Sequence, residues 1–486
     1  MDDAPVTTSP APAKRPIWQR PVSRRAVLAT GATGAAAAAL AVLWKGNDLS
    51  QILNQVRDLT HGYQGPLSSE RVRVAHLLRR AGFGASKTEL DHYAAMGQTA
   101  ATEALLNYSK TPNTTLESQL PTIDLSTGTQ PAAAAIQGWW LQRMAETGRP
   151  LEEKMTLFWH GLLTSGLDKA GTAQLFTQNQ LYRGLALGNF DDLLKAVSKD
   201  PAMMVYLDTE TNRKGKPNEN YARELMELFT TGIGHYTEDD VRESARAFTG
   251  WTLPGAKQLR YATTSLFVAR LHDAGPKTFM GKTGNFTGDD IVEMLVPLRA
   301  TAMRLSSRLF SFFAYPNPDS GIVNHLADTF QKSRYNVGAV VREIFTMDAF
   351  YSDKAYRALV KTPAELVAQT LKATGATGKS YAAAAAAMAP MGQVLFYPPN
   401  VAGWPGGSSW INSSTLLTRI NFANAATQRS RATLASQTLA QLSDTLVDAN
   451  VSPTTRDGLQ AFAAAHPDDQ AGLIFMVLAT PEFQLN

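Results

Sequence analysis

The sequence contains no cysteine among its 486 residues. This absence excludes disulfide bonds, thiolate metal sites and a cysteine nucleophile. Several local signatures of catalysis are missing too. No histidines have the HExxH or HxH spacing of a metal site, no GxSxG element marks a hydrolase nucleophile, and no glycine-rich phosphate loop occurs. Any chemistry must therefore come from residues that the fold brings together from separate segments.

The body of the chain also lacks an excess of one charge. The formal net charge is +4, but residues 1–45 hold six of the 46 basic residues and two of the 42 acidic ones, which leaves 40 of each in residues 46–486. A protein that binds the phosphate backbone of nucleic acid normally carries a basic surplus. The composition therefore argues against a nucleic-acid partner.

Long hydrophobic runs are missing except near the N-terminus. There, Arg24 and Arg25 precede an alanine-rich apolar run that ends at Trp44. This arrangement is typical of a twin-arginine export signal. We expect residues 1–45 to be this signal or an uncleaved N-terminal anchor, the one segment in contact with a membrane, and residues 46–66 to be a tether. The expected location is the periplasm, the cell surface or the medium.

Helical periodicity dominates the rest of the chain. The length exceeds the roughly 250–300 residues that a single hydrophobic core usually serves. We predict a mainly α, multi-helix globular protein built as one large unit or two helical subdomains, with a helical core region over 67–350 and a C-terminal helical region over 351–486. The helical period breaks near 266–280, where at most a small β-hairpin is expected.

Charged residues are most concentrated between Asn218 and Trp251, and the pattern predicts a pair of helices over 217–250. Gly232 suits the left-handed residue that follows a helix end. Thr237 and Asp240 have the spacing of a capping box at the start of the second helix. The first helix has an apolar face made of Tyr221, Ala222, Leu225, Met226, Leu228 and Phe229.

The polar faces of these two helices have two interpretations. In the first, Glu219, Arg223, Glu224 and Arg246 form one partly buried ionic network that joins the helices, because each guanidinium can hold two carboxylate oxygens. In the second, which is the commoner outcome for such spacing, the same side chains form a solvated face of weak ion pairs.

Several segments recur in a known family. The central stretch reads NENYARELMELFTTG, then YTEDDV, then ARAFTGW, and further motifs are LLRRAGFG at 77–84, HDAGPK at 272–277, KTPAE at 361–365 and RINF at 419–422. Over roughly residues 70–425 the chain resembles the bacterial family known as domain of unknown function 1800. The resemblance implies a mostly helical exported protein and brings no established activity.

A site of histidine and carboxylate side chains is the first functional hypothesis. His160, His272 and Asp273 lie in motifs of this resemblance, and Glu219 or Glu224 would complete a set for acid/base catalysis. The same types of group bind a divalent metal, for which we expect His160, Glu224, His272 and Asp273 as ligands. A more common role for such histidines is a hydrogen-bonded place in the core.

We expect this site where the HDAGPK loop meets the polar face of the first central helix. Arg223 would set the protonation of Glu224, and Lys277 would attract an anionic group of the substrate. The structural alternative is that His272 and Asp273 only cap neighbouring backbone groups and stiffen the loop.

A non-catalytic role is the second hypothesis. An exported scaffold or accessory protein would bind a partner or a polysaccharide at the cell surface, with contacts from Arg246, Trp251, Lys277, Trp404 and Trp410. Tryptophans in glycine- and proline-rich loops are more often packing anchors than sugar-stacking platforms. The family resemblance implies a partner similar to the exported sulfatase and alkaline-phosphatase group.

The two hypotheses differ in a spatial expectation. An enzyme should gather His160, Arg223, Glu224 and His272 around one concave pocket. A scaffold should spread these residues among separate structural contacts.

Overall fold

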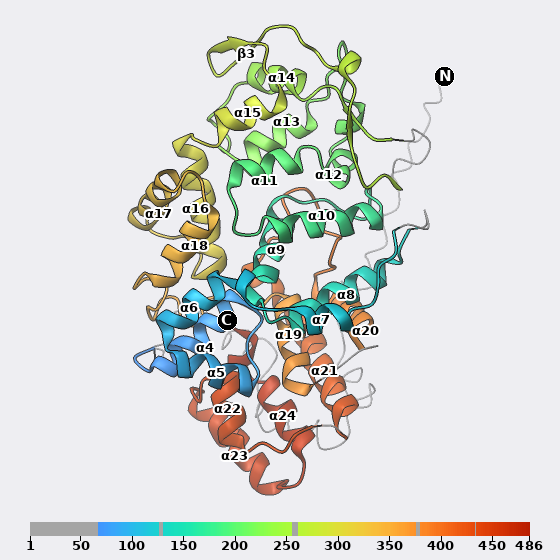
Figure 1. Ribbon diagram of the computed structural model, residues 1–486. Coiled ribbons are helices and arrows are strands. Elements are labelled where there is room, and N and C mark those ends of the chain that lie inside the picture. Colours follow the sequence, from blue (N-terminus) through green and yellow to red (C-terminus); the bar gives the residue numbers. More distant parts are fainter. Residues whose placement is uncertain (1–66, 126–129, 255–260, 376–379, 433) are drawn as a thin grey trace, which may run out of the picture.

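A computed structural model describes residues 67–486, apart from 126–129, 255–260, 376–379 and 433. The expected export signal and tether lie outside the described residues. Helices dominate the described part, which confirms the predicted mainly α fold. Figure 1 shows the central stretch and its small sheets at one end of the molecule and the last three helices at the other.

The first half of the described chain is a series of short helices that ends with the two helices of the central stretch. They are α4 (Glu70–Ala81), α5 (Lys87–Met96), α6 (Gln98–Leu106), α7 (Thr114–Gln119), α8 (Ala133–Glu146), α9 (Pro150–Leu162), α10 (Thr172–Gly184), α11 (Phe190–Val197), α12 (Pro201–Tyr206), α13 (Asn220–Glu224) and α14 (Glu238–Ala247).

The second half returns to helices after the two small sheets. These helices are α15 (Gly288–Leu295), α16 (Arg299–Phe313), α17 (Ser320–Lys332), α18 (Val337–Thr346), α19 (Pro363–Thr374), α20 (Ser380–Ala387), α21 (Ser413–Ser430), α22 (Leu439–Val447), α23 (Pro453–Ala465) and α24 (Gln470–Leu478).

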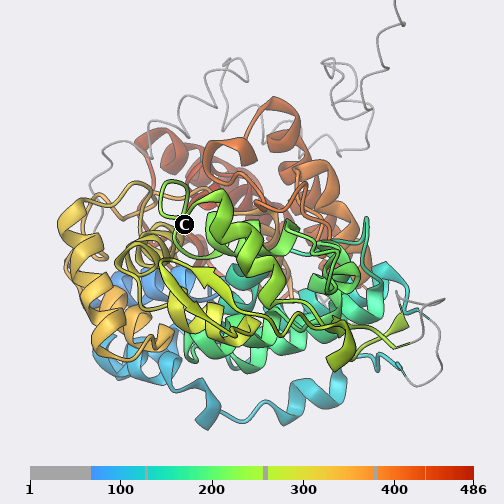
Figure 2. The ribbon, with the colours of Figure 1, turned by 90° about the horizontal axis from the view of Figure 1, so that it is seen from above.

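Apolar side chains gather in two cores. The first is built mainly by α4–α6 and α9–α18, and the second mainly by α8 and α19–α24. Trp159 in the first core and Trp140 in the second are both completely buried. The view along the long axis in Figure 2 shows the helices of the two cores crossing behind the central stretch. The central stretch therefore rests on a wide packed base.

The strands near 266–280 pair differently from the predicted hairpin. Strand β2 (Leu266–Phe267) is antiparallel to β1 (Trp251–Thr252), and β3 (Lys277–Phe279) is antiparallel to β4 (Lys282–Gly284). Met280 and Gly281 form the two-residue turn between β3 and β4 with φ of 48° and 75°. This geometry twists the strands in their preferred sense, and it leaves residues 272–276 as a connection between two separate sheets.

Among the described residues, no helix combines the length and the apolar character that crossing a membrane requires.

Candidate functional site

The first central helix widens before it ends. Helix α13 continues into a π-helical turn over Leu225–Phe229. The hydroxyls of Thr230 and Thr231 donate to the carbonyls of Leu225 and Met226 at 2.6 and 3.1 Å. Gly232 follows with φ of 84°, which confirms its predicted left-handed conformation, although the helix already ends at Phe229. Residues 231–237 then form the loop that leads to α14; Thr231 and Gly232 are buried, and residues 233–235 are exposed.

The second central helix starts as predicted. The Thr237 side chain accepts a hydrogen bond from the Asp240 amide, and the Asp240 carboxylate accepts one from the Thr237 amide. Asp240 also accepts a 2.7 Å hydrogen bond from the Met280 amide, so it ties α14 to the turn after β3. Its pKa is held below the usual range because these hydrogen bonds outweigh its burial.

The predicted four-residue ionic network is wrong. Arg223 binds both carboxylate oxygens of Glu238 at 2.8 and 2.7 Å and lies 3.4 Å from Glu219. The Arg223 and Glu238 side chains are 35% and 73% exposed, so this pair lies in solvent. Arg246 belongs to another cluster, and the pKa of Glu224 is raised by burial and then by the charge of Glu227.

We therefore expect Arg223→Ala to change the free energy of unfolding by less than about 1 kcal/mol, the usual limit for an exposed ion pair. Chemical denaturation measures this, with Arg242→Ala as the control because Arg242 forms an exposed pair with Asp239 on α14. A loss of several kcal/mol for Arg223→Ala alone would mean that this face is buried.

The HDAGPK loop is fastened to α14. Arg246 donates to Asp273 at 2.8 Å and to Glu243 at 2.7 Å, and the hydrogen bond from Arg246 lowers the pKa of Asp273 to about 2. The Asp273 amide donates to the Thr249 hydroxyl at 2.8 Å. His272 Nδ1 lies 2.9 Å from the Thr249 carbonyl oxygen. These contacts favour the structural role of His272 and Asp273.

Lys277 is turned inward as well. Its Nζ donates to the carbonyls of Asp273 and Gly275 at 2.6 and 3.0 Å, and the residue is 1% exposed. Its ammonium group therefore closes the loop through two backbone carbonyls.

His160 lies in a third environment. Its Nε2 accepts a 3.1 Å hydrogen bond from the Phe396 amide, and its ring packs against Trp140, Phe396 and Trp404. Burial lowers the pKa of His160 to about 3, so the ring is neutral at pH 7. His160 holds the 396–404 segment against α9 and has no contact with the HDAGPK loop.

The expected metal site is not assembled. Within the described residues, no group of three or more histidine, aspartate or glutamate side chains is arranged to hold a metal ion. His272 and Asp273 lie together beside Thr249, but His160 contacts the Phe396 amide and Glu224 lies on α13, so the structure does not bring the four residues together.

The tryptophans proposed for binding serve packing. Trp410 is 4% exposed, and Trp404 covers the His160 ring. Trp251 packs on Phe267 across the first sheet, with the Lys199 ammonium 5.3 Å from its ring. These contacts agree with the alternative interpretation, in which the tryptophans are packing anchors that hold their loops in place.

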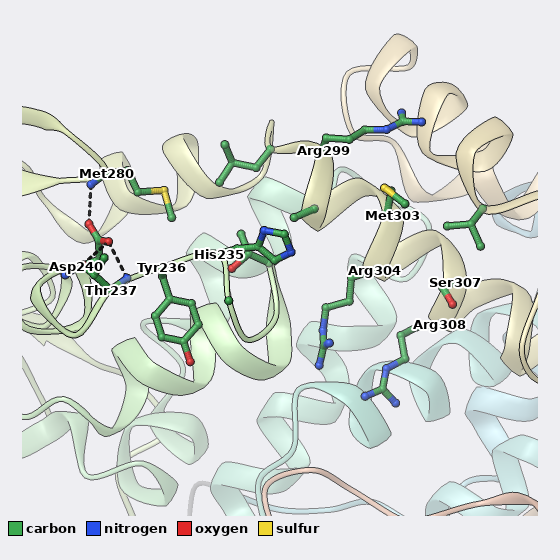
Figure 3. A pocket seen from close by; sticks show the side chains of 15 residues that line it. His235, Tyr236, Thr237, Asp240, Met280, Arg299, Met303, Arg304, Ser307 and Arg308 are labelled. Atoms are coloured by element: carbon green, nitrogen blue, oxygen red, sulfur yellow. Dashed lines mark hydrogen bonds between the residues drawn. The ribbon is translucent and has the colours of Figure 1, made fainter. Parts of the chain in front are cut away.

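A pocket of about 1110 Å³ opens beside the loop of the central stretch. It lies between this loop, the turn after β3 and helix α16 (Figure 3). Its walls are made by Thr231, Gly234, His235, Tyr236, Thr237, Asp240, Met280, Leu298, Arg299, Ala300, Met303, Arg304, Ser307, Arg308 and Val323. The central stretch thus forms one wall of a concave site, although none of its predicted catalytic residues lines it.

Two arginines dominate the electrostatics of this pocket. Arg304 and Arg308 are one helical turn apart on α16, and Figure 3 shows their side chains extending in the same direction. Arg304 Nε donates to the Leu228 carbonyl at 3.2 Å. Burial, and then the charge of Arg308, lowers the pKa of Arg304. Neither guanidinium forms an ion pair with a carboxylate in the described part of the chain, and the charge of Glu227 offsets the lowered pKa of Arg304 only in part.

The third arginine of the pocket is occupied. Arg299 pairs with Asp328 at 2.6 Å and donates to the side chain of Asn324 at 2.9 Å. The acid in the pocket wall, Asp240, is used by the backbone contacts described above. The uncompensated polar groups are therefore cationic or neutral.

The family assignment follows from comparison with known proteins. Residues 76–485 match the model of a family described as "Protein of unknown function (DUF1800)". The chain belongs to the DUF1800 family. No curated protein and no solved structure matches the chain.

In this DUF1800 protein, sequence reasoning missed Arg304 and Arg308. A signal was present, because the α16 segment RATAMRLSSRLFSFF contains three arginines and no acidic residue. A helix surface usually balances its charges with pairs at i,i+4. An acid-free helix with arginines on one face therefore indicates a partner outside the helix.

Proposed function

We propose that this protein is an exported, non-catalytic binding protein that holds an anionic ligand group in the pocket between the central loop and α16. The observation that carries the proposal is the pair Arg304 and Arg308, two neighbouring guanidinium groups without a carboxylate partner among the described residues. Arginine binds sulfate, phosphate and carboxylate groups through paired N–H donors.

The pocket also has an apolar side. Met280, Leu298, Met303 and Val323 line the same space as the two arginines. A site with apolar walls and a few convergent polar groups binds a ligand of mixed character. We therefore propose a ligand with an anionic head and an apolar portion.

A binding role fits the structure better than catalysis. The enzyme hypothesis needed His160, Arg223, Glu224 and His272 around one pocket, and none of the four lines the pocket beside α16. They take part in separate contacts instead, which is the arrangement expected of a scaffold. An accessory role beside an exported sulfatase- or phosphatase-like partner would suit a pocket for sulfate or phosphate monoesters.

Titration calorimetry with hexyl sulfate tests the proposal. We expect Arg304→Ala and Arg308→Ala each to weaken binding about 10–100-fold, since a hydrogen bond to a charged group contributes about 1.5–3 kcal/mol. Arg242→Ala is the matched control, because Arg242 is exposed and outside the pocket. Equal affinity in all four proteins, or no binding to the unaltered protein, would refute the pocket assignment.

We further propose export by the twin-arginine route, which rests on Arg24 and Arg25 ahead of the apolar run. Both residues lie outside the described part of the chain. Changing both to lysine keeps the charge and removes the guanidinium pair, so the variant is expected to accumulate in the cytoplasm. Fractionation and immunoblotting measure this, and export at the unaltered level would contradict the proposal.

A further inference from the structure

A cluster of cations is buried between the two cores. Arg79 and Arg80 come from α4, Lys154 from α9 and Arg419 from α21, while Arg357 and Lys361 precede α19; none is more than 4% exposed. We call these six residues the buried cation cluster. Among the described residues, two carboxylates, Glu365 and Asp448, form ion pairs with members of the cluster, so its six cations outnumber these carboxylates by four.

The two carboxylates are fully used by half of the cluster. Asp448 binds Arg79 at 2.5 Å and lies 3.8 Å from Arg357. Glu365 pairs with Lys154 and accepts a 2.7 Å hydrogen bond from the Thr362 amide. Arg80, Lys361 and Arg419 have no carboxylate within ion-pair distance in the described residues.

In the described part of the chain, the hydrogen bonds of those three cations go to backbone carbonyls, and Lys361 Nζ also lies 4.1 Å from the centre of the Phe483 ring. Arg80 Nη2 donates to Ala355 at 2.5 Å, Arg419 Nη2 donates to Lys361 at 2.8 Å, and Lys361 Nζ donates to Phe483 at 2.5 Å. A neutral carbonyl satisfies one N–H group and does not offset the charge, and Glu365, which acts on all three cations, carries a single negative charge. A buried charge that is not offset is strongly destabilising.

Several guanidinium N–H groups also lack any acceptor. Nε and Nη1 of Arg80, Nε and Nη1 of Arg419, and Nη2 of Arg79 are buried without a hydrogen-bond partner among the described residues. A native interior normally satisfies such donors. Five unsatisfied donors on three arginines of one cluster therefore call for an acceptor outside the described residues.

Loss of protons does not remove the excess charge. Burial lowers the pKa of Arg80 to about 9 and that of Arg419 to about 10, so both remain charged at neutral pH. Burial also lowers the pKa of Lys361 well below its usual value. Even with Lys361 neutral, five cations face two carboxylates in the described part of the chain.

We infer that the buried cation cluster binds a small inorganic anion, a halide or an oxyanion, which accepts hydrogen bonds from Arg80 and Arg419 and offsets their charge. Buried water would satisfy the N–H groups but would leave the charge. Arg80, Lys361 and Arg419 lie in the LLRRAGFG, KTPAE and RINF motifs, so segments far apart in the sequence meet at this anion. The site shares no residue with the pocket beside α16.

The anion content of the full, folded protein tests this inference. The protein is exchanged into sodium gluconate, then unfolded, and the released ions are measured by ion chromatography. We expect about one chloride, phosphate or sulfate ion per chain, and the chromatogram identifies which of them it is. Arg304→Ala/Arg308→Ala should release the same amount, because the pocket is a separate site. A chain that releases no inorganic anion would overturn the inference and leave water as the acceptor.

A measurement of thermal stability tests whether Arg80 and Arg419 bind the anion. The thermal midpoint in chloride or phosphate is compared with that in gluconate at equal ionic strength, because an anion that binds only the folded state raises the midpoint. We expect an increase of a few degrees that disappears in Arg419→Met or Arg80→Met. An increase that persists in both variants would refute their role. If neither variant folds, the anion content of the unaltered protein decides the question.

Discussion

Asp448→Asn is expected to lower the free energy of unfolding by about 3–5 kcal/mol, because it leaves two buried guanidinium groups without a counter-charge. The Asp448 side chain is fully buried between Arg79 and Arg357 and also accepts a 2.8 Å hydrogen bond from the Tyr356 hydroxyl. Asp448 has φ of 56°. Asparagine tolerates this left-handed conformation as well as aspartate does, so the backbone is not strained. Chemical denaturation measures the loss.

Asp444→Asn is the matched control. Asp444 lies on α22, four residues earlier, and pairs with Arg71, but both side chains are more than 30% exposed. An exposed pair contributes at most about 1 kcal/mol. Equal small losses for the two variants would show that the charges around Asp448 remain hydrated.

Glu153→Gln should cost a similar amount, about 3–5 kcal/mol. Glu153 is completely buried and accepts hydrogen bonds from Arg183 at 2.6 and 2.9 Å, from Arg143 at 2.8 Å and from Trp140 at 3.0 Å. Burial alone would raise the pKa of Glu153, but the two arginines outweigh it and lower the pKa from 4.5 to about 2.

Because the pKa of Glu153 is lowered, the free energy of unfolding of the variant should depend on pH differently from that of the unaltered protein. The stabilisation from ionised Glu153 is complete above pH 4.5 and is lost as the pH falls through about 2. The unaltered protein should therefore lose on the order of 3 kcal/mol over this interval from this group, and Glu153→Gln should lose less. The measurement is the free energy of unfolding against pH.

The neighbouring residue provides the control. Burial, and then the charge of Glu153, raises the pKa of Glu152, so ionised Glu152 does not stabilise the fold. Glu152→Gln is expected to leave stability nearly unchanged or to increase it. If the two variants lose the same free energy of unfolding, Arg143 and Arg183 do not specifically stabilise the charge of Glu153.

Local signals in the sequence were sufficient for the helices. The Thr237 and Asp240 capping box, the left-handed conformation of Gly232 and the apolar face that contains Tyr221 and Leu225 all depend on residues within a few positions of one another. These signals are short-range and can be read from neighbouring positions, so the mainly α fold could be predicted from them.

The pairing of strands and the site depended on distant contacts. Leu266 pairs with Thr252 across a long connection, and Met280 occupies a left-handed position that usually favours asparagine or glycine. His160 is a residue type that often binds metals, but its hydrogen-bond partner is the backbone amide of Phe396, 236 positions later in the sequence. No sequence spacing contains that information.

Anomalous diffraction from crystals soaked in sodium selenate, a heavier analogue of sulfate, tests the central claim most directly. We predict a selenium peak in the pocket beside α16, with its oxygens within hydrogen-bond distance of the guanidinium groups of Arg304 and Arg308, and no such peak in the Arg304→Ala/Arg308→Ala variant. An empty pocket in the unaltered protein, or an unchanged peak in the variant, would contradict the account.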